Sequence, residues 1–387
     1  MSPIRKMVWT KPHSFGQLCD GSRPLTDTLE MILFVHRPNR NVSALTAHGR
    51  PADRFAAPGA GARCKPAYDG PVTNPLSLLA DRWHPSPQLV RRAALAALVM
   101  SVVIVVTGGA VRLTDSGLGC TTWPRCTADS VTPTPEMGVH GVIEFTNRML
   151  TYVLSAAIGW FILAARCAKP WRHSLTKLGW AQFWLVVSNA VLGGITVLTD
   201  LNPYVVALHM VAAMGLVWAA VLSWERSGEG DGAPRPLAAP GIQRFARVLV
   251  ASIGALVLVG TLVTGAGHHP GSSGTWRIPV DYDRLVQAHA DLVFLSVGLT
   301  LAALLVFAAV KVPPAARARV RELFALLLLQ GVLGFVQYFT DAPELMVGLH
   351  MLGAALVWGA ALRVPLALRT RAGVPSQADA PSAELVA

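Results

Sequence analysis

The sequence contains little charge for its length. Only 14% of its 387 residues are Asp, Glu, Lys or Arg, whereas about 25% of the residues of a typical soluble protein are charged. Hydrophobic residues make up 52% of the chain, enough for eight stretches of roughly 20 residues, the length of a helix that crosses a bilayer. This composition excludes a soluble globular enzyme.

Acidic residues are scarce, with 22 Asp and Glu against 33 Lys and Arg. A net charge of +11 could indicate a nucleic-acid partner. Most of the excess, however, lies in residues 1–92, and the rest is in short loops between apolar runs. Membrane topology produces that distribution, so we expect no nucleic-acid partner.

Residues 1–87 lack a sustained hydrophobic period and are rich in Pro, Gly and Arg. We therefore expect a disordered N-terminal extension. The apolar segment 31–35 is too short for the core of a signal peptide, and no small-residue cleavage site follows it. Membrane insertion therefore falls to the helices that come later.

Eight apolar stretches follow and predict an all-α integral membrane protein with eight transmembrane helices. They cover residues 93–111, 140–165, 178–198, 205–224, 248–266, 285–310, 322–339 and 347–362. Eighteen Lys and Arg flank these helices on one side of the membrane and four on the other. The positive-inside rule then places both termini in the cytoplasm of a multi-pass plasma-membrane protein.

The chain also repeats itself. Residues 191–210 align with 332–351 without a gap, and 106–108 match 263–265. We expect two tandem four-helix bundles related by an internal repeat. The predicted parts are the first half at 88–226, a cytoplasmic linker at 227–241, the second half at 242–371, and a disordered tail at 372–387.

Four histidines stand near the starts of alternate helices, on the side expected to face outward: His140, His209, His289 and His350. A lone His at such a position is usually a plain interfacial residue. Four at repeat-related positions, with His140 matched to His289 at an offset of 149 residues, favour a function. Two imidazoles on facing helices can hold one haem iron between them.

The helix that begins near His140 carries a second signal. His140, Glu144, Asn147 and Arg148 share one helical face because they are spaced at i, i+4, i+7 and i+8. Charged side chains within a span are costly and by default functional, although an ion pair that only joins helices is the simpler reading. At the offset of 149 residues, Glu144 aligns with Val293, so only the first half has the carboxylate. This asymmetry suggests that one haem takes part in the chemistry and the other transfers electrons.

Cys120 and Cys126 lie in a loop on the expected outer side. A Cys pair in an oxidising compartment is normally a disulfide, and here a structural staple is favoured over a redox relay. Two Cys alone make a poor zinc site.

Together these features resemble haem A synthase, the membrane enzyme that oxidises the C8 methyl of haem O to a formyl group, giving haem A for cytochrome oxidase. The resemblance covers residues 93–362. It rests on residues 107–120 with Cys126, on residues 143–148, on the two Leu-His-Met segments and on the eight-helix repeat.

The resemblance implies that the first half binds haem O as substrate and that the second holds a permanent haem B through His289 and His350. His209 would be one ligand on the substrate side. The family's Glu-x-x-His-Arg pattern departs here, because Asn147 occupies the ligand position. The role therefore passes to His140, about two turns earlier.

In this reading Glu144 is the catalytic residue, which accepts a proton or positions water. Asn147 and Arg148 support it, with Arg148 paired either to a haem propionate or to Glu144. Haem O synthase is the expected donor of haem O, the bilayer lipid surrounds the protein, and a homo-oligomer is compatible with the pattern. Two alternatives stay open. A di-haem b-type membrane electron-transfer protein would need the histidines but not Glu144, and a transporter would bind no haem.

Overall fold

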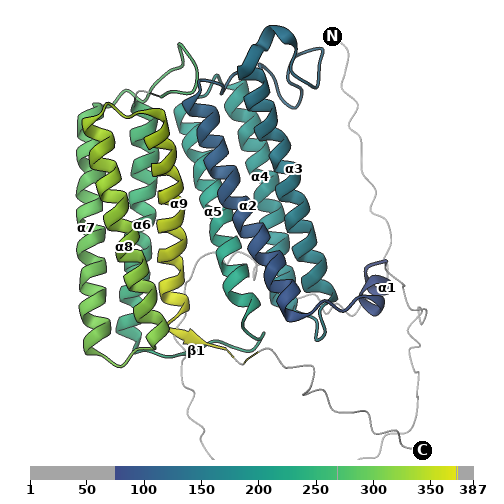
Figure 1. The fold of residues 1–387 in the computed structure, drawn as a ribbon, viewed down its shortest axis with the longest axis vertical. Coiled ribbons are helices and arrows are strands. Elements are labelled where there is room, and N and C mark those ends of the chain that lie inside the picture. Colours follow the sequence, from purple (N-terminus) through teal and green to yellow (C-terminus); the bar gives the residue numbers. More distant parts are fainter. Residues whose placement is uncertain (1–74, 268, 372, 374–387) are drawn as a thin grey trace, which may run out of the picture. The chain divides into compact units, whose positions relative to one another are not determined.

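The computed structural model describes residues 75–267, 269–371 and 373. Most of the predicted N-terminal extension and most of the predicted tail lie outside the described residues, as does His268. The eight long helices are α2 (Pro87–Leu113), α3 (Gly138–Cys167), α4 (His173–Leu198), α5 (Pro203–Ser227), α6 (Pro240–Ala266), α7 (Tyr282–Ala309), α8 (Pro314–Phe339) and α9 (Glu344–Leu366) (Figure 1).

These eight helices are each long and apolar enough to cross a membrane. The expectation of an all-α integral membrane protein is therefore confirmed. The shorter elements are α1 (Pro75–Arg82), the 3₁₀ helix η2 (Pro135–Met137), and the strands β1 (Arg235–Pro236) and β2 (Arg369–Thr370), which pair antiparallel.

Local sequence fixes where several helices begin. Proline occupies the first turn of α2, α5, α6 and α8, where its missing N–H costs nothing. The side chains of Ser86, Asn202 and Asp281 accept hydrogen bonds from backbone N–H groups at the starts of α2, α5 and α7. Such caps satisfy donors that a helix start otherwise leaves unpaired.

The helices pack in two groups of four (Figure 1). In the first bundle, α2 packs on α3 and α5, and α4 packs on α3 and α5; α6 to α9 make the same set of neighbours in the second bundle. Between the bundles, α9 packs on α2 and α5, and α5 on α6. The internal repeat itself stays a prediction from the sequence.

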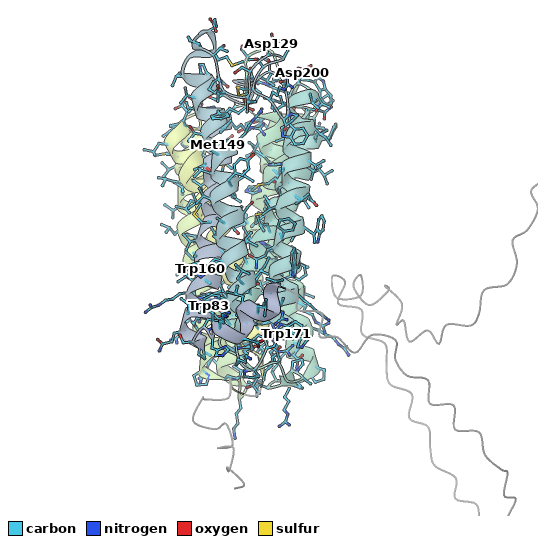
Figure 2. The ribbon with its side chains drawn as sticks, turned by 90° about the vertical axis from the view of Figure 1, so that its right-hand side faces the viewer. Trp83, Asp129, Met149, Trp160, Trp171 and Asp200 are labelled. Atoms are coloured by element: carbon cyan, nitrogen blue, oxygen red, sulfur yellow. A yellow bond between two sulfur atoms is a disulfide. The ribbon has the colours of Figure 1, made fainter. Side chains whose placement is uncertain are left out.

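The two ends of the first bundle differ in chemistry (Figure 2). Asp129 and Asp200 lie at one end, whereas Trp83 and Trp171 lie at the other, with Trp160 on the outer surface nearer the tryptophan end. Trp160 and Trp171 are exposed, and exposed indoles near one end of a span are typical of a membrane–water interface. Helix α1 begins within the segment expected to be disordered, and Trp83, which follows it, packs against the core of the first bundle.

Candidate functional site

The second bundle brings His289 of α7 and His350 of α9 face to face. Their ring centroids lie 6.5 Å apart, and the ring planes are inclined by 56°. The buried Nδ1 atoms of both rings have no hydrogen-bond partner among the described residues. A neutral imidazole can bind a metal through either ring nitrogen, so two facing rings can hold one ligand between them.

The spacing of this pair suits a metal held from both sides. A metal–imidazole bond is about 2 Å long, so an iron with one ring on each side holds the ring centroids roughly 6 Å apart. Helices α7 and α9 are diagonal in the bundle, since each packs on both α6 and α8. The pair therefore spans the interior of the bundle and fits axial ligation of a haem.

A glycine of the preceding helix makes room for each of these rings. A Cβ added at Gly260 of α6 would lie 2.9 Å from Cε1 of His289, and one at Gly334 of α8 would lie 3.3 Å from Cε1 of His350. These contacts are tighter than ordinary packing allows. Both glycines are thus part of the site, and neither was among the predicted residues.

His209 of α5 has the same surroundings in the first bundle. A Cβ at Gly193 of α4 would lie 3.1 Å from its Cε1, and its buried Nδ1 lacks a hydrogen-bond partner among the described residues. The ungapped alignment of 191–210 with 332–351 already paired Gly193 with Gly334. That pairing was the signal that could have identified the glycines.

Two tight turns of the same conformation precede His209 and His350. Asp200 and Leu201 have positive φ values of 51° and 58°, and Asp341 and Ala342 have values of 55° and 53°. Non-glycine residues rarely adopt this left-handed conformation. The turns start α5 and α9 so that each His is the seventh residue of its helix.

His140 is placed differently from the other three. It is exposed, and it is only the third residue of α3. Its Nδ1 lies 3.0 Å from the hydroxyl oxygen of Ser116. Because α3 begins directly after η2, which ends at Met137, His140 lies in the first turn of its helix. His209, by contrast, is the seventh residue of α5.

Asn147 lies two turns deeper in α3, against α2. The hydroxyl of Thr107 donates a hydrogen bond of 2.9 Å to Oδ1 of Asn147, and both residues are partly buried. Thr107 was not among the predicted site residues.

Glu144 and Arg148 form a buried ion pair that reaches into the outer loop. Oε1 of Glu144 accepts hydrogen bonds from Nε and Nη2 of Arg148, and Oε2 accepts one of 2.6 Å from the backbone N–H of Cys120. Nη1 of Arg148 donates to the carbonyl oxygens of Thr122 and Arg125, at 3.1 and 3.2 Å. Of the two partners predicted for Arg148, the described residues show Glu144.

The loop held by this pair is closed by a disulfide. Cys120 and Cys126 are joined, as the sequence predicted. Trp123 of the same loop packs on α4, since a Cβ at Gly194 would lie 2.5 Å from its indole. Gly194 is the neighbour of Gly193, against which His209 lies, so the loop reaches the His209 end of α4.

The two bundles are tied together at the same end. Arg112 at the end of α2 donates hydrogen bonds to the carbonyl oxygens of His269, at 2.7 Å, and Thr264, at 2.9 Å. A Cβ at Gly109 of α2 would lie 2.4 Å from the sulfur of Met351, the residue after His350. Helices that carry candidate residues of both halves are therefore in direct contact.

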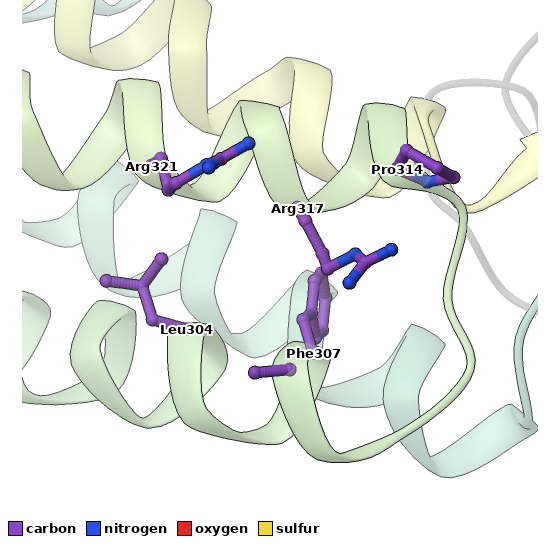
Figure 3. Close-up of a pocket in the computed structure, with 6 residues that line it drawn as sticks. Leu304, Phe307, Pro314, Arg317 and Arg321 are labelled. Carbon is purple, nitrogen blue, oxygen red and sulfur yellow. The ribbon is translucent and has the colours of Figure 1, made fainter.

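A groove of about 320 Å³ lies elsewhere, between α7 and α8 (Figure 3). It is lined by Leu304, Phe307, Ala308, Pro314, Arg317 and Arg321. Phe307 is near the end of α7, whereas His289 is in the second turn of that helix. The groove is thus separate from the histidine site.

Part of the chain is similar to known proteins. The sequence profile of the COX15-CtaA family, described as cytochrome oxidase assembly protein, matches residues 91–270. These 180 residues are therefore similar to the COX15-CtaA family. The matched COX15-CtaA segment contains Glu144, Asn147 and His209, while His289 and His350 lie beyond it.

Several curated proteins are similar over part of their length. A heme A synthase from Lysinibacillus sphaericus is 32% identical over 134 residues, which cover 33% of this chain and 41% of that protein. A heme A synthase from Shewanella oneidensis is 26% identical over 183 residues, covering 43% and 53%. A protoheme IX farnesyltransferase from Thermus thermophilus is 28% identical over 283 residues, covering 68% and 46%. The chain spans about half the length of these relatives or less.

Proposed function

We propose that this protein is a haem A synthase, an oxidoreductase that converts the C8 methyl of haem O to a formyl group. The observation that carries the proposal is the His289–His350 pair, with ring centroids 6.5 Å apart and buried Nδ1 atoms that lack partners among the described residues. The COX15-CtaA match and the heme A synthase relatives support the choice of substrate.

His289 and His350 would hold haem B in the second bundle. Their spacing, their diagonal helices and the glycines beneath the rings fit such a group. Bound there, haem B would supply one-electron transfer. Helices α5 and α9, which carry His209 and His350, are in contact, so the two proposed haem sites would lie on neighbouring helices.

Haem O, the substrate, would bind in the first bundle with its iron on His209. The sequence assigned the second ligand to His140. That residue is exposed and hydrogen bonded to Ser116, so in this proposal only His209 keeps its role as a ligand from the first half.

Glu144 is proposed to accept a proton as the methyl group is oxidised. Its carboxylate accepts hydrogen bonds from Arg148 and from the backbone N–H of Cys120. The same contacts fasten the outer loop, and a purely structural ion pair is the competing interpretation. The two interpretations differ in what Glu144→Gln does, because glutamine retains the shape and an acceptor oxygen but not the basicity.

The histidine end of both bundles is proposed to face outward from the plasma membrane, with both termini in the cytoplasm. The excess of Lys and Arg in the loops at the other end supports this orientation. The disulfide supports it as well, because disulfides persist outside the cytoplasm.

The test is to purify the full-length protein, extract and identify its haems, and follow conversion of added haem O under oxidising conditions. We expect bound haem B in the purified protein and formation of haem A. Replacing His350 by Ala should remove the haem B signal, whereas replacing His173, a cytoplasmic-side histidine that stacks on Trp171, should not. Protein that binds no haem would favour the transporter alternative and contradict the proposal. Protein that binds two haems but leaves haem O unchanged would favour the electron-transfer alternative.

A further inference from the structure

The imidazole sites of this protein share one local design. His209, His289 and His350 each lie against a glycine of the helix that precedes their own, on α4, α6 and α8 respectively. Helix α3 offers one more such place, where it meets α2. Asn147 occupies it, and its contacts there are the Thr107 hydroxyl and Gly108.

The contacts of Asn147 and His289 also lie at similar positions along α2 and α6. Gly108 is five residues before the end of α2, and Gly260 is six residues before the end of α6. The contact of Asn147 with α2 therefore corresponds in position to the contact of His289 with α6. At this level the first bundle carries an amide where the second carries an imidazole.

An amide cannot take over the role of the imidazole. The nitrogen of a side-chain amide is a donor only, with no free lone pair for a metal. The oxygen of Asn147 is already engaged, because it accepts the hydrogen bond from Thr107. Besides this oxygen, Asn147 offers the N–H donors of its amide.

His140 does not restore the missing ligand. It lies seven residues before Asn147, about 10 Å closer to the outer end at the usual rise of a helix. It is exposed, its Nδ1 is paired with Ser116, and its own backbone packs against Gly119. The described part of the first bundle thus has one buried imidazole in the shared design, that of His209.

We infer that the first bundle binds the iron of its haem through His209 alone and leaves the opposite axial position open to a small uncharged ligand beside Asn147. This inference rests on the proposed function, since it concerns the haem bound in the first half. One imidazole in the first bundle and two in the second would give the two haems different functions. A haem held by two imidazoles would be limited to electron transfer, whereas a haem held by His209 alone would leave room for a small molecule at its iron.

The test measures carbon monoxide binding and haem spin state in the full-length protein loaded with haem O. Carbon monoxide binds readily to a reduced haem with an open axial position and poorly to one held by two imidazoles. We expect one low-spin haem that ignores carbon monoxide and one high-spin haem that binds it. Asn147→His should convert the second haem to low spin and abolish its carbon monoxide binding.

Two variants serve as controls. Met149→His places the same new imidazole on the same helix, but two residues further on, where the side chain is exposed and faces another direction (Figure 2). It should leave both signals unchanged. His140→Ala should also leave them unchanged, because His140 is not a ligand in this account.

The possible results distinguish failure of this inference from failure of the proposed function. Two low-spin haems in the unaltered protein, with carbon monoxide binding appearing only in His140→Ala, would overturn the inference and leave the proposed function in place. Failure to take up haem O beside the resident haem would overturn the proposed function and the inference with it. The measurement on the unaltered protein decides the matter even if Asn147→His does not fold.

Discussion

The second bundle carries two facing imidazoles, whereas the first carries one imidazole, an amide at the place of the other, and a buried Glu–Arg pair. His289 and His350 face each other across the second bundle, whereas Glu144 and Arg148 reach out to a disulfide-closed loop. One helix arrangement can thus provide a closed, symmetric site or an open, polar one. The difference depends on a few side chains and on the length of the loop between the first two helices of each bundle.

The largest effect is expected from removing the feature that only the first bundle has. Glu144→Gln should slow haem A formation by about 10²–10⁴-fold, the usual contribution of a positioned acid or base. Haem B should remain bound, since His289 and His350 are untouched. Haem O turnover and the haem B spectrum are measured on the same preparation. An unchanged turnover rate would reduce Glu144 to an anchor of the loop.

The glycine contacts allow a sharper test of the second bundle. Gly260→Ala places a methyl group 2.9 Å from the His289 ring, which should displace the ligand and weaken haem B binding by about 10–100-fold, as disturbed support of a metal ligand does. Gly254→Ala on the same helix meets nothing closer than 3.6 Å, on Trp358, and is the matched control. Equal haem B affinity in the two variants would contradict the packing argument.

The contact between the bundles is tested by Arg112→Ala. This change removes both hydrogen bonds that Arg112 donates to the second half and should destabilise the protein by about 3 kcal/mol, since bonds from charged donors contribute about 1.5–3 kcal/mol each. Thermal unfolding in detergent measures it, with Arg125→Ala as a control in the exposed outer loop. A melting temperature lowered no further than that of the control would show that the bundles do not depend on Arg112.

The smallest effect is expected from opening the outer loop. Replacing Cys120 and Cys126 by Ser should lower the free energy of unfolding by about 2 kcal/mol, less than the estimate of about 3 kcal/mol for a 15-residue loop. Haem B binding should persist because the loop belongs to the first bundle. If the double variant lost haem B but kept haem O turnover, the loop would have been assigned to the wrong site.

The sequence predicted the membrane class, the eight spans and the disulfide because hydrophobic length and cysteine pairing are local signals. It did not show that His140 is exposed at the start of α3, because that start depends on η2 and on how the outer loop folds back, and a periodic pattern does not locate a helix start. The offset of 149 residues paired His140 with His289, whereas the packing of α3 on α2 pairs Asn147 with it. Helix α1 was missed because it is short, and Trp83, which follows it, packs on a core that forms only in the folded protein.

The most direct test of unequal bundles compares His209→Ala with His289→Ala in full-length protein purified without added haem O. Low-temperature electron paramagnetic resonance, with extraction of the bound haem, reports the resident low-spin haem B. We expect this signal to survive in His209→Ala and to disappear in His289→Ala. The reverse pattern, with the signal lost in His209→Ala and kept in His289→Ala, would contradict the assignment of the resident haem to the second bundle.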